Sequence, residues 1–208
     1  AGERQLWDFP DTVLGLREVA AYEVSQQLGI PHVPPTVWRE DLPLGPGSLQ
    51  LWIDDASVAD VDVVESPDEG WLHVLDAELT DGTCVQVVHR DLPDLRALAL
   101  LDAVMNNADR KAGHLLRDPE GRLWAVDHGV TFHAEPKLRT VLWGFAARPI
   151  EQALLQRISD DLLDIPALRT ALTDAELVAL RHRINDLHTS GRYPLPSEDW
   201  PAIPWPIF

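Results

Sequence analysis

Two loops that each carry an aspartate flank one short predicted β-hairpin in the middle of this chain. Residues 114–117 and 122–126 are predicted strands, and the intervening Asp-Pro-Glu-Gly has the composition of a tight turn. Asp109 precedes the first strand, and Asp127 follows the second. Because antiparallel pairing places the start of one strand beside the end of the other, we expect His114 and its loop to lie beside Asp127.

The same order of residues occurs in the phosphoryl-transfer site of protein kinases. There a loop aspartate orients the attacking hydroxyl, while a polar residue five positions later and the aspartate of an Asp-x-Gly hold Mg²⁺ on the phosphates. Asp109, His114 and Asp127 occupy these three positions in this sequence. The alternative interpretation is that Asp109 and the adjacent Arg110 form an ordinary surface ion pair.

The two loops together resemble those of the phosphatidylinositol 3-/4-kinase superfamily, which pairs an Asp-Arg-x₃-Asn loop with a later Asp-x-Gly. The matching stretches are Asn-x-Asp-Arg-x₃-His-Leu-Leu at 107–116 and Val-Asp-His-Gly-Val-Thr-Phe at 126–132. From Trp7 to Pro206, the chain is similar to an uncharacterised actinobacterial family of such kinase-like proteins.

This resemblance implies an ATP-dependent phosphotransferase that uses Mg²⁺ or Mn²⁺. By position, Asp109 matches the catalytic base with Arg110 beside it, Asp127 and His114 match the metal ligands, and Asn107 is a further candidate ligand. His114 departs from the superfamily pattern, in which asparagine stands. Imidazole nitrogen suits Mn²⁺ or Zn²⁺ better than Mg²⁺, which prefers oxygen ligands.

We expect an α+β fold, formed by a mostly helical kinase-like C-lobe with short β-hairpins and an incomplete amino lobe. Residues 1–54 would be the remnant of the amino lobe, and residues 55–192 the C-lobe. Residues 193–208 are too rich in proline for a helix or a central strand. They are predicted to form an extended tail, with Trp200 and Trp205 packed into grooves of the body.

One predicted helix in the amino lobe runs from a capping Asp11 to Leu28. In a kinase this helix carries the glutamate that pairs with the nucleotide-binding lysine, and Glu18 is the candidate; a solvated helix glutamate is the alternative. The only lysines are Lys111 and Lys137, which both lie in the C-lobe. We therefore expect a fragment that lacks the phosphate-binding lysine and the Gly-rich loop, with Glu18 facing solvent or an arginine.

Residues 48–54 are predicted to form a strand, because polar and apolar side chains alternate from Ser48 to Leu51. In a kinase the adenine-binding hinge falls at this point of the chain, so the backbone amides of Leu51, Trp52 and Ile53 would bind the nucleotide. An ordinary sheet strand is the alternative interpretation.

Two helices are predicted near the end of the chain. Residues 150–163 are expected to form the first. The second begins at the capping box formed by Thr173 and Glu176 and ends at Gly191. Both are expected to build the core of the fold.

The formal net charge of −17 restricts the partners. A surface this acidic repels nucleic acid and anionic bilayers. The partners that the kinase resemblance implies are a nucleotide and an unknown acceptor, which we expect to be a protein or a small molecule. No apolar run approaches the ~20 residues of a membrane span. Cys84, the only cysteine, is expected to be a buried, inert thiol in a strand, and the absence of disulfides indicates a cytoplasmic protein.

Two other functions fit the same residues. A catalytically degenerate kinase fold could serve as a nucleotide- or protein-binding module. A metal hydrolase could use His114, Asp127, His128 and His133, although no recognised zinc motif such as His-Glu-x-x-His is present.

Overall fold

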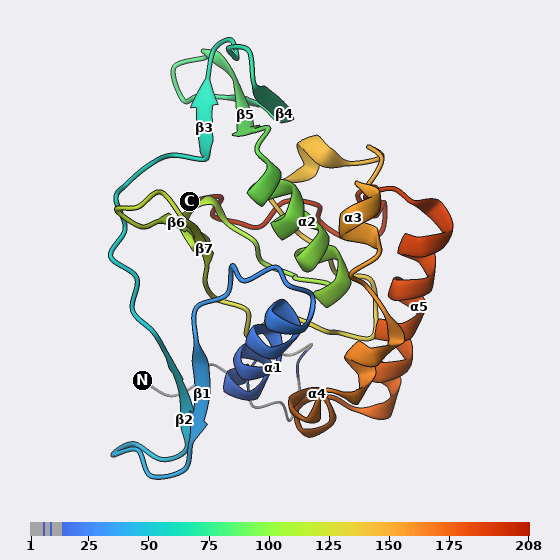
Figure 1. Ribbon diagram of the computed structural model, residues 1–208. Helices are drawn as coiled ribbons and strands as arrows, with labels where there is room; N and C mark the ends of the chain where they lie inside the picture. The colour runs from blue at the N-terminus through green and yellow to red at the C-terminus, as the bar shows by residue number, and fades with distance from the viewer. Residues whose placement is uncertain (1–5, 7–8, 10–13) are drawn as a thin grey trace.

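The computed structural model describes residues 6, 9 and 14–208, and it has a mixed α+β fold (Figure 1). The predicted helix cap Asp11 lies outside the described residues. The helices and strands, in chain order, are α1 (Leu14–Gln27), β1 (Thr36–Arg39), β2 (Gly47–Gln50), β3 (Val61–Val64), β4 (Trp71–Glu78), β5 (Cys84–Arg90), α2 (Pro93–Met105), β6 (Leu115–Arg117), β7 (Leu123–Ala125), α3 (Gln152–Leu155), α4 (Pro166–Ala171) and α5 (Asp174–Ser190).

Helix α1 packs against the antiparallel β1–β2 hairpin. Gly29 ends the helix region with a φ of +61°, a conformation that glycine adopts without steric cost. Strand β2 stops at Gln50, so the prediction of a strand over residues 48–54 is wrong beyond that point. Leu51 and Trp52 are 55% and 84% exposed, and no neighbouring strand covers them. The apolar–polar alternation of this stretch therefore does not reflect burial of one face.

Strands β3, β5 and β4 form an antiparallel sheet at the opposite end of the molecule from the β1–β2 hairpin (Figure 1). The turn between β4 and β5 contains Gly82, with a φ of +87°. Cys84 is exposed, which corrects the prediction of a buried thiol. It opens β5 at the edge of the molecule, whereas Val85, Val87 and Val88 further along this strand are buried.

Helix α2 runs through the centre of the core. Its residues Leu95, Leu98, Leu101 and Met105 have no exposed surface, because α5 and the chain around it cover the helix. The predicted capping box of α5 is confirmed, since Thr173 and Glu176 bond each other's backbone N–H groups. The predicted end of this helix is confirmed as well.

The single helix expected over residues 150–163 is wrong. The chain forms α3 and then a separate 3₁₀ turn at Asp160–Asp164, with Ser159 in an extended conformation between them. Arg157 donates to the carbonyl oxygen of Gly29 at 2.6 Å, and Ile158 is buried. Anchoring of both residues redirects the chain, and this tertiary effect outweighs the helical propensity.

The tail after Tyr193 has no regular structure and lies against the body, as expected. The carbonyl oxygen of Ala202 accepts from Thr140 N and Trp143 Nε1, and that of Ile207 accepts from Ala112 N. Trp205, in contrast, is 84% exposed, so the prediction that it packs into a groove is wrong. None of the helices within the described residues combines the length and apolar character needed to cross a membrane.

Candidate functional site

The β6–β7 hairpin brings the two aspartate-bearing loops together, as the sequence predicts. Leu115 pairs with Ala125, and Val126 N donates to the carbonyl oxygen of His114 at 3.0 Å. His114 is the last residue of a 3₁₀ turn just before β6, and the Nε2 atom of its side chain lies 3.4 Å from Oδ2 of Asp127. Residues that are thirteen positions apart in sequence therefore share one site.

Arg110 connects these two loops to helix α2. Its guanidinium is fully buried and forms a bidentate pair with Asp102, at 2.9 and 3.0 Å. The same group donates to Val126 O at 2.8 Å and contacts His128 Nε2 at 2.6 Å. Arg110 was predicted beside the catalytic base, and in the structure it positions the backbone of both loops without reaching the surface.

His128 completes this buried cluster as a neutral imidazole. Because Arg110 can only donate, His128 Nε2 must accept, which places the single ring proton on Nδ1. Burial lowers the pKa of His128 well below its usual value, and the electrostatic interactions with Arg110 and His114 lower it further. Asp102 and His128 were not recognised as partners of Arg110 from the sequence. The available signal was Asp102 itself, the one charged residue among the otherwise apolar positions 97–105 of helix α2.

Asp127 stands in the left-handed region of backbone conformation, with a φ of +59°. Residues other than glycine seldom adopt this conformation, although aspartate does so more often than most. Its carboxylate is 59% exposed, whereas the adjacent Val126 and His128 are directed into the fold by their bonds to Arg110. The turn therefore presents one carboxylate outward beside His114, and such backbone strain is often found at functional sites.

His114 has the protonation state that a metal ligand needs. Burial lowers its pKa, and Arg110 acts in the same direction, while Asp127 and Asp109 oppose the change. A neutral imidazole retains a lone pair for a cation. Its Nδ1 is buried and has no hydrogen-bond partner within the described residues.

Asp109 lies at the mouth of the loop and forms an ion pair with Lys111, whose Nζ is 3.2 Å from Oδ2. Asn107 stabilises the conformation of this loop through its side-chain amide. Its side-chain oxygen accepts from Asp109 N at 3.0 Å, and its Nδ2 donates to Asp102 at 2.9 Å. Asn107 is fully buried and uses both ends of its amide in this way, so it shapes the loop and does not face Asp127.

Glu18 in α1 packs directly on the Asp-His-Gly turn. Its Oε1 accepts from His128 N at 2.7 Å, and its Oε2 lies 3.8 Å from His128 Nδ1. Burial raises the pKa of Glu18 to about 7, and the negative charge of Asp127 raises it as well. The predicted orientation toward solvent or an arginine side chain is therefore wrong, because the partner is a backbone amide of the turn.

The proposed adenine-binding residues lie in the segment that follows β2. Leu51 N donates to Pro35 O at 2.9 Å, so this amide is already used to close the β1–β2 hairpin. The side chain of Ile53 is partly buried, whereas Trp52 is exposed. The binding role predicted for Leu51 does not fit its backbone geometry, and the roles of Trp52 and Ile53 stay predictions.

The four residues of the metal-hydrolase interpretation do not converge. His133 accepts from Glu135 N through Nδ1 and is stacked edge-on against Phe9. Across the described part of the chain, no group of three or more His, Cys, Asp or Glu side chains is arranged to hold a metal ion. Any cation at the pair of His114 and Asp127 would need further ligands from a bound molecule.

No protein-family model matches this sequence. Protein Rv2133c of Mycobacterium tuberculosis (strain ATCC 25618 / H37Rv) is 44% identical over 225 aligned positions, which cover the whole of this chain and 80% of the relative. The chain belongs to the family of protein Rv2133c. The name Rv2133c specifies no reaction, so the function has to be inferred from the geometry around Asp109, His114 and Asp127.

Proposed function

We propose that this chain is an ATP-dependent phosphotransferase of the phosphatidylinositol 3-/4-kinase-like type. The observation that supports this most is the 3.4 Å approach of His114 Nε2 to Asp127 Oδ2, with Asp109 on the loop that leads to His114. A hydroxyl-orienting carboxylate beside a metal-binding pair is the arrangement that phosphoryl transfer requires.

The order of elements is consistent with a kinase-like C-lobe. Helix α2 leads into the Asp109 loop, the β6–β7 hairpin follows, and the Asp-His-Gly turn comes directly after it. Helix α1 contributes Glu18 to the back of this turn, and the β1–β2 hairpin packs on the same helix. This order supports the expectation drawn from the sequence resemblance, an analogy at the level of the fold.

The residues present suit a divalent cation bound together with a nucleotide. Mg²⁺ in phosphotransferases is held by one or two carboxylates, and phosphate oxygens and water supply its other ligands. Asp127 offers one exposed carboxylate, and His114 offers a neutral imidazole whose nitrogen favours Mn²⁺. A bound cation would neutralise negative charge on the phosphates.

Asp109, Lys111 and Arg110 would orient the reacting groups and the two loops. Asp109 would accept a hydrogen bond from the acceptor hydroxyl and orient it for attack. Lys111, which is paired with Asp109, would stabilise negative charge on the transferred phosphoryl group. Arg110 keeps the Asp109 loop and the Asp127 turn at a fixed separation, because it binds both from inside the fold.

The acceptor is proposed to be a protein or a small molecule. The net charge of −17 opposes work at an anionic membrane surface and binding of nucleic acid. A divalent cation between His114 and Asp127 would offset this field locally for the nucleotide.

A catalytically degenerate nucleotide- or protein-binding module is the second candidate. The ion pair between Asp109 and Lys111 favours it, because a carboxylate that is already paired is a weaker acceptor for a substrate hydroxyl. Glu18 also uses its carboxylate on His128 N, although kinases pair this residue with a lysine.

Calorimetric titration of the full-length protein with ATP, in Mg²⁺ and in Mn²⁺, tests the proposal. We expect metal-dependent binding that Asp127→Asn abolishes. Asp109→Asn should keep the binding but lose phosphoryl transfer, since its role is confined to the chemistry. Binding by the wild type without transfer to any hydroxyl or to water would favour the degenerate module. Absence of metal-dependent binding would overturn the phosphotransferase and the nucleotide-binding form of the second candidate.

A further inference from the structure

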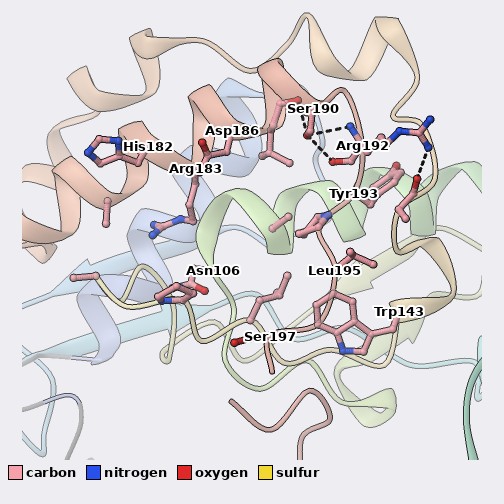
Figure 2. Close-up of a pocket in the computed structure, with 18 residues that line it drawn as sticks. Asn106, Trp143, His182, Arg183, Asp186, Ser190, Arg192, Tyr193, Leu195 and Ser197 are labelled. Atoms are coloured by element: carbon pink, nitrogen blue, oxygen red, sulfur yellow. Dashed lines mark hydrogen bonds between the residues drawn. The ribbon is translucent and has the colours of Figure 1, made fainter. Parts of the chain in front are cut away.

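A cavity of about 610 Å³ lies away from the Asp109 site, between α5, the end of α2, the segment after the Asp-His-Gly turn and the tail (Figure 2). Its volume is within the roughly 300–1,000 Å³ that small-molecule sites occupy. In Figure 2, Arg183 and Asn106 lie at one end of the cavity, and Trp143 and Leu195 lie at the other. The lining is mainly apolar, and its charged residues are Arg183 and Asp186 of α5 and Arg192 just after this helix.

Arg183 is the polar group that distinguishes this cavity. Its Nε donates to Val104 O at 3.1 Å, and its Nη1 donates to His133 O at 3.2 Å. The remaining Nη2 is buried and has no acceptor within the described residues. Buried guanidinium nitrogens without a partner are uncommon, and an anionic oxygen is the strongest acceptor for them.

The apolar end of the cavity complements this cation. Trp143 and Tyr193 supply buried aromatic surface, and Leu195 in the tail is 68% exposed beside them. A straight-chain or aromatic body could cover Leu195 and still place an acidic group near Arg183. Because the protein as a whole is strongly acidic, this local cation provides specific rather than general attraction for an anion.

We propose that this cavity is a binding site for a small amphiphilic carboxylate, with the acid at Arg183 and the apolar body toward Trp143 and Leu195. Alternate residues of the segment after the turn, Ala134 and Pro136, form part of its wall. The occupant would therefore contact the segment that Asn106 holds in place by accepting from Lys137 N and donating to Glu135 O. The site does not depend on the function proposed for the Asp109 loop.

Headgroup recognition is tested by calorimetry on the full-length protein with decanoate, decan-1-ol and decyltrimethylammonium, which share one alkyl chain. We expect decanoate to bind about tenfold or more tightly than the alcohol, a factor typical of one charge-assisted contact. In Arg183→Gln, this preference should disappear. Equal binding of acid and alcohol by the wild type, or a preference for the cation, would overturn the proposal.

The position of the ligand is tested by filling the cavity. Ala179 lines it from α5, so Ala179→Phe should weaken decanoate binding about tenfold or more. Val178→Phe is the matched control, because Val178 is 56% exposed on the same helix, outside the cavity lining, and its replacement should leave binding unchanged. Unchanged binding in Ala179→Phe would place the ligand elsewhere and overturn the proposal.

Hydrogen exchange on the wild type provides a test that does not require the variants to fold. Decanoate should slow the exchange of backbone amides in residues 133–138 and 193–197, which border the cavity. Protection confined to other segments, or none at saturation, would also overturn the proposal.

Discussion

Arg110 and Asp102 form a bidentate ion pair from which solvent is excluded, with Nε 2.9 Å from Oδ2 and Nη2 3.0 Å from Oδ1. The pair connects the middle of helix α2 to the Asp109 loop. The remaining donors of Arg110 reach the strand end and the histidine that flank Asp127. One buried guanidinium therefore sets the distance between the proposed catalytic and metal-binding loops.

Replacement of Arg110 by methionine should lower the free energy of unfolding by about 3–5 kcal/mol, because it leaves Asp102 as a buried charge without its cationic partner. The double variant Arg110→Met with Asp102→Leu should recover a large part of this loss. Arg169→Met serves as the control, since Arg169 pairs with Asp164 at the exposed surface and should contribute at most about 1 kcal/mol. Urea unfolding measures the change in the free energy of unfolding for each of the three variants. Similar losses in Arg110→Met and Arg169→Met would contradict the role assigned to Arg110.

The features of the site that could be predicted from the sequence are those set by residues close together along the chain. The turn between β6 and β7 fixes the register of the hairpin, and this register alone brings His114 to Asp127. The capping box of α5 is similarly local, because its two partners are three residues apart.

The partners of Arg110 and Glu18 could not be predicted in this way. Arg110 meets His128 because the core buries both, and Glu18 meets His128 N because α1 packs across the turn. Sequence patterns report which residues prefer burial, but not which buried polar groups face each other. The break at Ser159 has a similar origin in contacts with distant residues.

His89 should make the stability of the protein depend on pH. Burial lowers its pKa from 6.5 to about 4, so the folded state keeps the imidazole neutral where the unfolded chain binds a proton. The stabilisation is fully present above pH 6.5, is lost as the pH falls toward 4, and does not change further below that. At about 1.4 kcal/mol per pH unit, the whole loss is about 3 kcal/mol.

The measurement is urea unfolding of the wild type and His89→Leu between pH 4 and 8. Glu18 contributes in the opposite direction, because its raised pKa gives stability that is lost as the pH rises toward 7. The difference between the two proteins at each pH removes this shared contribution. A difference that stays constant from pH 8 to 4 would show that His89 is not the titrating group.

Gly144 lies so close to β4 and β5 that a side chain does not fit. An added Cβ would lie 2.5 Å from Nε2 of His89 and 2.6 Å from Cβ of Leu72. We expect Gly144→Ala to destabilise the protein by about 1–3 kcal/mol, the usual cost of overpacking. Gly47→Ala is the control, because its Cβ would meet only Leu42 at 3.5 Å, an ordinary contact. Thermal unfolding of both variants gives the comparison, and equal melting temperatures would contradict the close packing at Gly144.

The last prediction concerns the metal preference set by His114. If its neutral imidazole is a ligand, nucleotide binding by the wild type should be tighter in Mn²⁺ than in Mg²⁺, following the preference of nitrogen donors for the softer ion. His114→Asn replaces nitrogen by an amide oxygen and should shift the ratio toward Mg²⁺ by about tenfold. Titrations with ATP in each metal measure the ratio, and His182→Asn, at an exposed histidine of α5, is the control that should leave it unchanged. An unaltered ratio in His114→Asn would remove His114 from the metal site and leave Asp127 as its sole identified ligand.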